Sequence, residues 1–185
     1  KKKKTKLKRK NLSFLQDFKK TKKATDAFII ASPVESHFDY VKKIIKRKKP
    51  FIIEKPLVAN IQELNQLYGL CRKYNKSIFV NHTDLYNPAF SSFLYELKSI
   101  GKYQKIDISF GKSQKTIFAR SLHSLPSFEW LPHPIALAIK IAGLPKRISI
   151  TKNKISVKKN YILQNCIIKL FCRKKIVNIK FSNSY

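Results

Sequence analysis

Methionine is absent from this 185-residue sequence, and glycine, cysteine and acidic residues are scarce. No apolar run approaches the roughly 18 residues that a membrane span needs, so no membrane partner is expected. No apolar stretch follows the basic N-terminus, which argues against a secretory signal peptide. The lack of methionine, at position 1 included, fits a chain that does not begin at its natural start.

Three cysteines are too few for a disulfide framework. Cys71, Cys166 and Cys172 cannot all pair, and they show neither a CxxC spacing nor companion histidines. We therefore expect them to be small core residues of a reduced, cytoplasmic protein.

Basic residues outnumber acidic ones by 40 to 10, giving a formal net charge of +30. One interpretation is a nucleic-acid-binding module, because lysines neutralise phosphates and release counterions. The other is codon bias, since lysine, isoleucine, asparagine, phenylalanine and tyrosine are all abundant and are encoded by A/T-rich codons. The lysines are scattered over the whole sequence, which favours codon bias. Under either interpretation we expect nonspecific binding to polyanions.

The first half alternates short apolar runs with amphipathic segments. We expect buried strands over residues 27–31, 51–53 and 77–80. A helix is predicted after the first run, with Ser32 as its cap, Pro33 at its first position and Glu35 completing a capping box. Strand–helix alternation of this kind calls for a parallel sheet.

A second helix is predicted from about Asn60, which would cap it, with Glu63 at the third position. Its buried face is expected to contain four residues: Ile61, Leu64, Leu67 and Cys71.

After about Asp84 the pattern changes. We predict a helix over 91–99, an alternating strand over 103–110 and a helix that ends at about Ala142. The remainder alternates as an antiparallel meander, with turns at 152–153 and 173–175. The sequence thus predicts two domains: 1–83, with a parallel sheet and a basic leader, and 84–185, an α+β domain with an antiparallel sheet.

Polar residues follow each of the three predicted parallel strands. They are Ser32-Pro33, Glu54-Lys55-Pro56 and Asn81-His82. In an open parallel sheet, ligands bind outside the carboxyl ends of the strands, so these clusters should meet at one edge.

Structural roles are open for each of these residues taken alone. His133 lies between two prolines and could cap a helix starting at Pro134. Glu129 could pair with any of many lysines, and His37 could be an ordinary half-buried residue. His82 and His123 have no distinctive spacing.

Four motifs in order resemble the Gfo/Idh/MocA oxidoreductases, over about residues 24–145. The first runs from Asp26 to His37, where a strand ends in Ala-Ser-Pro and a histidine follows four residues past the proline. The second is Glu-Lys-Pro at 54–56, and the third comprises Asn81-His82 and Asn-Pro at 87–88. The fourth, Trp-Leu-Pro-His at 130–133, resembles the family's W-x-G-P-H-D stretch. The expected fold class is therefore α/β: a partial Rossmann-type parallel sheet followed by an α+β domain.

The resemblance implies an NAD or NADP cofactor and hydride transfer to or from a sugar-like hydroxyl, such as that of a nucleotide sugar. By position, Ser32, Pro33 and His37 would lie along the cofactor, with Glu54 near its ribose. Lys55 would contact both the cofactor and the reacting hydroxyl, held by a bond to Pro56 that is cis in the family.

On the substrate side, the resemblance implies that His133 is the catalytic acid/base. An imidazole with a pKa near 6.5 can both accept and return a proton. Glu129 would orient the His133 ring, and His82 is a further candidate for substrate binding.

Some residues depart from the family pattern. No glycine-rich turn precedes residue 26, Leu131 replaces a glycine, and Pro134 replaces an aspartate. We therefore expect the first strand–helix–strand unit to be missing and NAD(P) binding by this chain alone to be weak. The alternatives to an oxidoreductase are a degenerate, non-catalytic remnant and the polyanion-binding module. Association into a homo-oligomer is also implied by the resemblance.

Overall fold

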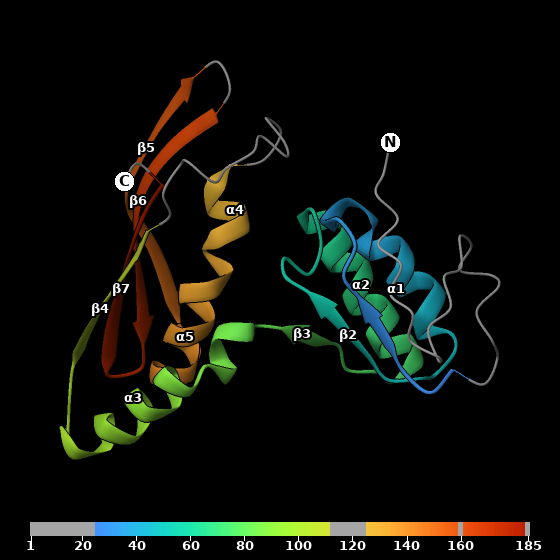
Figure 1. The fold of residues 1–185 in the computed structure, drawn as a ribbon, viewed down its shortest axis with the longest axis horizontal. Coiled ribbons are helices and arrows are strands. Elements are labelled where there is room, and N and C mark those ends of the chain that lie inside the picture. Colours follow the sequence, from blue (N-terminus) through green and yellow to red (C-terminus); the bar gives the residue numbers. More distant parts are fainter. Residues whose placement is uncertain (1–24, 112–124, 159–160, 184–185) are drawn as a thin grey trace, which may run out of the picture.

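A computed structural model describes residues 25–111, 125–158 and 161–183. It contains two sheets, one of three strands and one of four, and the chain passes from one to the other after β3 (Figure 1). No helix in these ranges is both long enough and apolar enough to cross a membrane.

The first sheet is parallel, in the order β1-β2-β3. Its strands are β1 (Phe28–Ile30), β2 (Phe51–Glu54) and β3 (Phe79–Asn81). Helices α1 (His37–Ile45) and α2 (Ile61–Tyr74) share one hydrophobic core with it. The three strands, these two helices and their connections are called the first unit below. The predicted parallel sheet is confirmed.

The other face of this sheet is apolar and exposed. Ile29, Ile52 and Phe79 are register neighbours across the three strands. Their exposed fractions are 76%, 37% and 48%.

The start of α1 differs from the prediction. Pro33 has φ −57° and ψ 145°, which is extended rather than helical. A 3-10 turn, η2 (Val34–Ser36), follows, and the regular helix begins only at His37. The capping box predicted from Ser32 is therefore wrong. Instead, the Ser32 hydroxyl accepts a hydrogen bond from the Ser36 hydroxyl at 2.7 Å.

The start of α2 is as predicted. The Asn60 side chain accepts a hydrogen bond from the Glu63 backbone N–H at 2.9 Å. In return, the Glu63 carboxylate accepts one from the Ala59 N–H at 3.0 Å. Leu67 is buried, but Ile61 is 60% exposed, so its predicted burial is wrong.

The second sheet has the order β4-β7-β6-β5. Its strands are β4 (Lys105–Gly111), β5 (Arg147–Lys158), β6 (Tyr161–Cys172) and β7 (Lys175–Ser182). β5, β6 and β7 form the predicted antiparallel meander, while β4 adds to β7 in parallel, so the sheet is mixed. No turn divides β5 at 152–153; a register irregularity between Ile150 and Lys152 occurs there instead.

Three helices accompany this sheet: α3 (Pro88–Ser99), α4 (Pro126–Trp130) and α5 (Pro132–Ala142). α3 begins earlier than predicted because the Asn87 side chain caps it by accepting a hydrogen bond from the Ala89 N–H. Residues of α5 and the inner faces of β4, β6 and β7 make a second core. This part is called the second unit below. All three cysteines are free, and Cys166 and Cys172 lie in this core.

Candidate active site

The carboxyl ends of β1, β2 and β3 bring the predicted polar clusters to one edge. Glu54 and Asn81 are register partners, and the Asn81 amide donates a 2.6 Å hydrogen bond to the Glu54 carboxylate. This bond fixes Glu54 at the end of the central strand.

His37 ties the first cluster to the second. Its Nε2 lies 2.8 Å from the carbonyl oxygen of Ser32, and its Nδ1 lies 2.9 Å from that of Pro56. The residue is only 1% exposed. It lines the cavity described below, but both ring nitrogens are occupied by backbone. His37 is thus a buried residue that joins two loops, and not the ordinary half-buried residue considered as the alternative to a cofactor-binding role.

Lys55 extends from the end of β2 toward the second unit. The Lys55–Pro56 peptide bond is cis. The ammonium group donates a 3.0 Å hydrogen bond to the backbone carbonyl of Glu129 and lies 5.1 Å from the centre of the Trp130 ring. A cation over an indole face is attracted by the ring quadrupole. Lys55 therefore links the two units.

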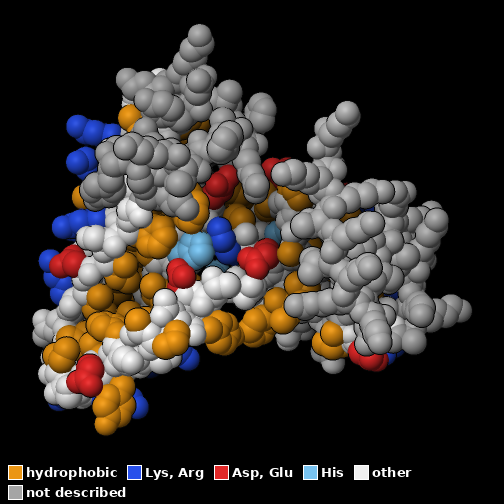
Figure 2. Space-filling model, viewed as in Figure 1, with side chains coloured by type: hydrophobic (Ala, Val, Ile, Leu, Met, Phe, Trp, Pro, Cys, Tyr) orange, Lys and Arg blue, Asp and Glu red, His pale blue; other side chains and the backbone are white. Residues whose placement is uncertain are grey.

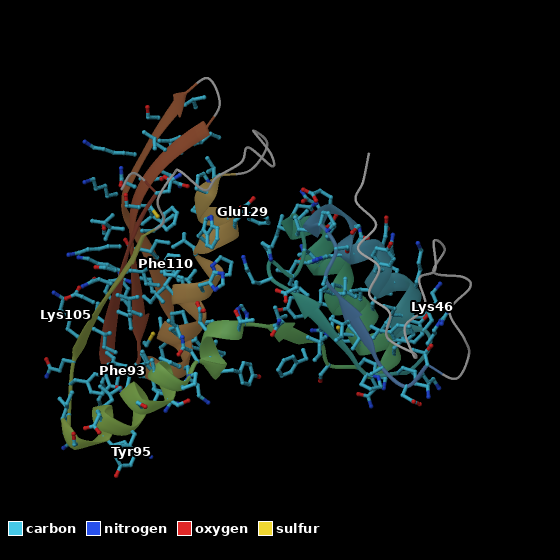
Figure 3. All side chains as sticks on the ribbon, viewed as in Figure 1. Lys46, Phe93, Tyr95, Lys105, Phe110 and Glu129 are labelled. Carbon is cyan, nitrogen blue, oxygen red and sulfur yellow. The ribbon has the colours of Figure 1, made fainter. Side chains whose placement is uncertain are left out.

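A cavity of about 630 Å³ opens beside this link. It is lined by Ala31, Ser32, Pro33, Val34, Glu35, His37, Lys55, Pro56 and Glu129. Figure 2 shows histidine, lysine and acidic side chains together in the region between the two units, and Figure 3 shows Glu129 on the side of α4 that faces the first unit.

His133 is the second residue of α5, so it does not cap a helix starting at Pro134. Its ring packs against both Phe110 and Trp130, with both ring centres 5.8 Å away and interplanar angles of 9° and 21°. Its Nδ1 lies 2.8 Å from a carboxylate oxygen of Asp84, although the N–H is not aligned for a regular hydrogen bond. The side chain is 12% exposed.

The electrostatics of the two site histidines favour their neutral forms. Burial lowers the pKa of His133 below its usual 6.5 and Lys55 lowers it further, while Asp84 acts in the opposite direction. Burial also lowers the pKa of His82, and the positive charges of His133 and Lys55 add to this. A neutral imidazole can accept a proton, which is what a base requires.

The structure thus brings Lys55, Glu129 and His133 together around Trp130, and it places His82 within electrostatic reach of both Lys55 and His133. Ser32 and Pro33 lie along the cavity. Glu129 was expected to orient the His133 ring with its carboxylate. In the structure, the backbone carbonyl of Glu129 accepts a hydrogen bond from Lys55, and the carboxylate beside the His133 ring is that of Asp84.

Asp84 is the site residue that sequence reasoning missed. It lies in the 3-10 turn η3 (Thr83–Tyr86), just past the end of β3. Its position beside the Asn81-His82 cluster was the available signal, but nothing in the sequence joins it to a histidine 49 residues later. In the described ranges, no group of three or more histidine, cysteine, aspartate or glutamate residues could hold a metal ion.

Comparisons with known proteins concern the family and the fold. Residues 2–82 match the family model described as oxidoreductase family, NAD-binding Rossmann fold (Gfo/Idh/MocA). Comparison with curated protein sequences gives no match.

Solved structures share the fold over most of this chain. An oxidoreductase from Agrobacterium radiobacter, in complex with NAD+, L-tartaric acid and magnesium, is 17% identical with a TM-score of 0.75; the match covers 86% of this chain and 48% of that one. Biliverdin reductase from Synechocystis sp. PCC 6803, in complex with biliverdin and NADP+, is 16% identical with a TM-score of 0.71, and the match covers 87% and 53%. The chain therefore spans about half the length of these structures. Within this chain, the likeness to the Gfo/Idh/MocA oxidoreductase family is carried by residues 2–82, which make up less than half of its length.

Proposed function

We propose that the protein is an NAD(P)-dependent oxidoreductase acting on a sugar-like hydroxyl, with Lys55 and His133 as its catalytic residues. The observation that carries this proposal is their meeting at Trp130. The two residues come from different units, 78 positions apart, yet both contact that one ring.

The residues present fit one half of the cofactor. Ser32, Pro33, Lys55 and Pro56 line a cavity outside the carboxyl ends of parallel strands, where such sheets bind nucleotides. Glu54, held by Asn81, would be the acceptor for ribose hydroxyls. In the part of the chain that the structure describes, no glycine-rich turn opens a helix that could hold a pyrophosphate. These residues therefore suit the nicotinamide and its ribose.

The bound cofactor would accept or supply the hydride, and the protein would manage the accompanying proton. Lys55 would donate a hydrogen bond from its ammonium to the reacting oxygen and stabilise negative charge there as the proton leaves. His133, kept neutral by burial and by Lys55, would accept that proton and return it in the reverse direction. His37, in this proposal, acts by holding the Ser32 and Pro56 loops in place rather than by contacting the cofactor.

The test begins with calorimetric titration of the full chain with NAD+ and NADP+. It continues by following reduced-nicotinamide absorbance against a panel of sugars and nucleotide sugars. Lys55→Ala and His133→Ala should each lower kcat/KM by about 10²–10⁴-fold, the usual contribution of a positioned acid or base. Lys105→Ala is the matched control, because Lys105 lies on the far face of the second sheet and pairs with Asp107.

Circular dichroism would establish that each variant keeps the native fold. Full activity in both the Lys55 and the His133 variants would overturn the proposal. Absence of cofactor binding by the full chain would instead favour the non-catalytic remnant.

A further inference from the structure

A carboxylate from a neighbouring element lies at the edge of the His133 ring. Asp84 lies in η3, directly after the parallel sheet, and η3 packs against α5, which carries His133. The Asp84 side chain is 37% exposed and that of His133 12%. The carboxylate thus reaches from the rim of the site to a largely covered ring.

Two aromatic rings pack against the imidazole. The ring centres of Phe110 and Trp130 each lie 5.8 Å from that of His133, at small interplanar angles, and 6.5 Å from each other. These contacts restrict the orientation of the imidazole ring. The Asp84 oxygen, 2.8 Å from Nδ1, marks the ring edge that faces η3.

A carboxylate beside Nδ1 also selects the proton position. An ionised carboxylate is only an acceptor, so it favours a proton on the nitrogen next to it. A neutral imidazole carries one proton; if Nδ1 holds it, Nε2 presents the lone pair that can accept another. The same logic gives a histidine base its correct tautomer in enzymes that use a His–Asp pair.

We propose that Asp84 is a positioning residue for His133: its carboxylate keeps the proton on Nδ1 and leaves Nε2 as the nitrogen that exchanges a proton with substrate. The acid/base part of this statement rests on the proposed function, whereas the tautomer part does not. Asp84 would take the orienting role for which Glu129 was the sequence candidate, and Glu129 would serve Lys55 through its backbone.

The direct test is NMR of the ring nitrogens in full-length protein labelled with ¹⁵N-histidine. The chain has four histidines, so a His133→Gln variant is enough to identify the His133 signals. We expect the neutral ring of the wild type to carry its proton on Nδ1. A wild-type ring with its proton on Nε2 would overturn the proposal without any variant.

Variants separate the role of Asp84 from the general charge of the site. Asp84→Ala should turn the single Nδ1–H form into a mixture of tautomers and lower the pKa of His133 further, because the favourable charge is removed while Lys55 remains. Asp84→Glu, which keeps a carboxylate, should retain the Nδ1–H tautomer and the pKa of His133 in part. Asp39→Asn, which removes an exposed carboxylate from α1, should change neither.

These outcomes are distinct from those that test the catalytic proposal. Unchanged tautomer and pKa in a folded Asp84→Ala protein would overturn the role of Asp84, even if His133→Ala abolished turnover. If the tautomer shifts as expected but His133→Ala is fully active, the positioning stands and the proposed function fails.

Discussion

His133 and His82 connect the chemistry of the site to the stability of the fold. For both residues, the cost of placing a charge in a covered site lowers the pKa in the folded protein below 6.5. The unfolded chain has no such restriction, so over a range of pH it binds protons that the folded chain does not. The same burial that makes these rings suitable bases therefore makes the protein sensitive to acid.

The stability of the protein should fall as pH decreases through about 6.5 and then level off below the folded pKa values. Above this window both states are neutral at these rings, and the penalty is absent. Urea unfolding of wild type, His133→Gln and His82→Gln between about pH 8 and about pH 5 would measure it. Each substitution should make the free energy of unfolding depend less steeply on pH. If a protein lacking both histidines showed the same pH dependence as the wild type, other groups would be responsible for the acid sensitivity.

At the level of elements, the start of helix α2 tests whether a helix boundary is determined by neighbouring residues in the sequence. Asn60 accepts a hydrogen bond from the Glu63 N–H, and a helix start without such a cap leaves that donor unsatisfied. Asn60→Ala should lower the free energy of unfolding by about 1 kcal/mol. Gln62→Ala, an exposed change in the same first turn, is the control and should have a smaller effect. Equal unfolding midpoints for the two variants would contradict a stabilising role for the cap.

The same comparison shows what could be predicted from sequence. The parallel strands and the start of α2 could be predicted because their signals are local: an apolar run, or a cap followed three residues later by glutamate. The site clusters could be predicted because topology alone puts the ends of parallel strands at one edge. Their roles came from the family resemblance.

What could not be predicted depends on contacts between distant residues. The start of α1 shifted to His37, whose ring bridges the backbone of Ser32 and Pro56, a contact with no local signature. The parallel pairing of β4 with β7 joins strands some 70 residues apart. The partner of His133 was Asp84, from the 3-10 turn that packs against α5, rather than Glu129 at a helical spacing.

At the scale of the whole molecule, the charge of +30 should produce nonspecific binding to polyanions. Affinity for duplex DNA, measured by fluorescence anisotropy, should fall steeply and linearly on a log–log scale as salt increases, because binding releases counterions. Two duplexes of unrelated sequence serve as mutual controls and should bind equally. A marked preference for one of them, maintained at about 0.15 M salt, would instead indicate a selected nucleic-acid function.

The two units have separate cores, and we propose that they unfold separately. No buried residue is shared between the two clusters of described residues, and one side-chain link between the units is the contact of Lys55 with Glu129 and Trp130. Ile53 in the first core and Ile179 in the second are both fully buried, so replacement of either by alanine should cost about 2–5 kcal/mol. They form a matched pair of probes.

The single tryptophan, Trp130, packs against the second core, so its fluorescence follows mainly the unfolding of that unit. Ile179→Ala should move the unfolding transition seen by Trp130 fluorescence to lower urea, whereas Ile53→Ala should leave it in place and move only the part seen by far-ultraviolet circular dichroism. Equal shifts of the fluorescence transition in both variants would mean that the two units unfold as one. In that case the Lys55–Trp130 contact would couple the two cores, and Lys55→Ala should then separate the transitions.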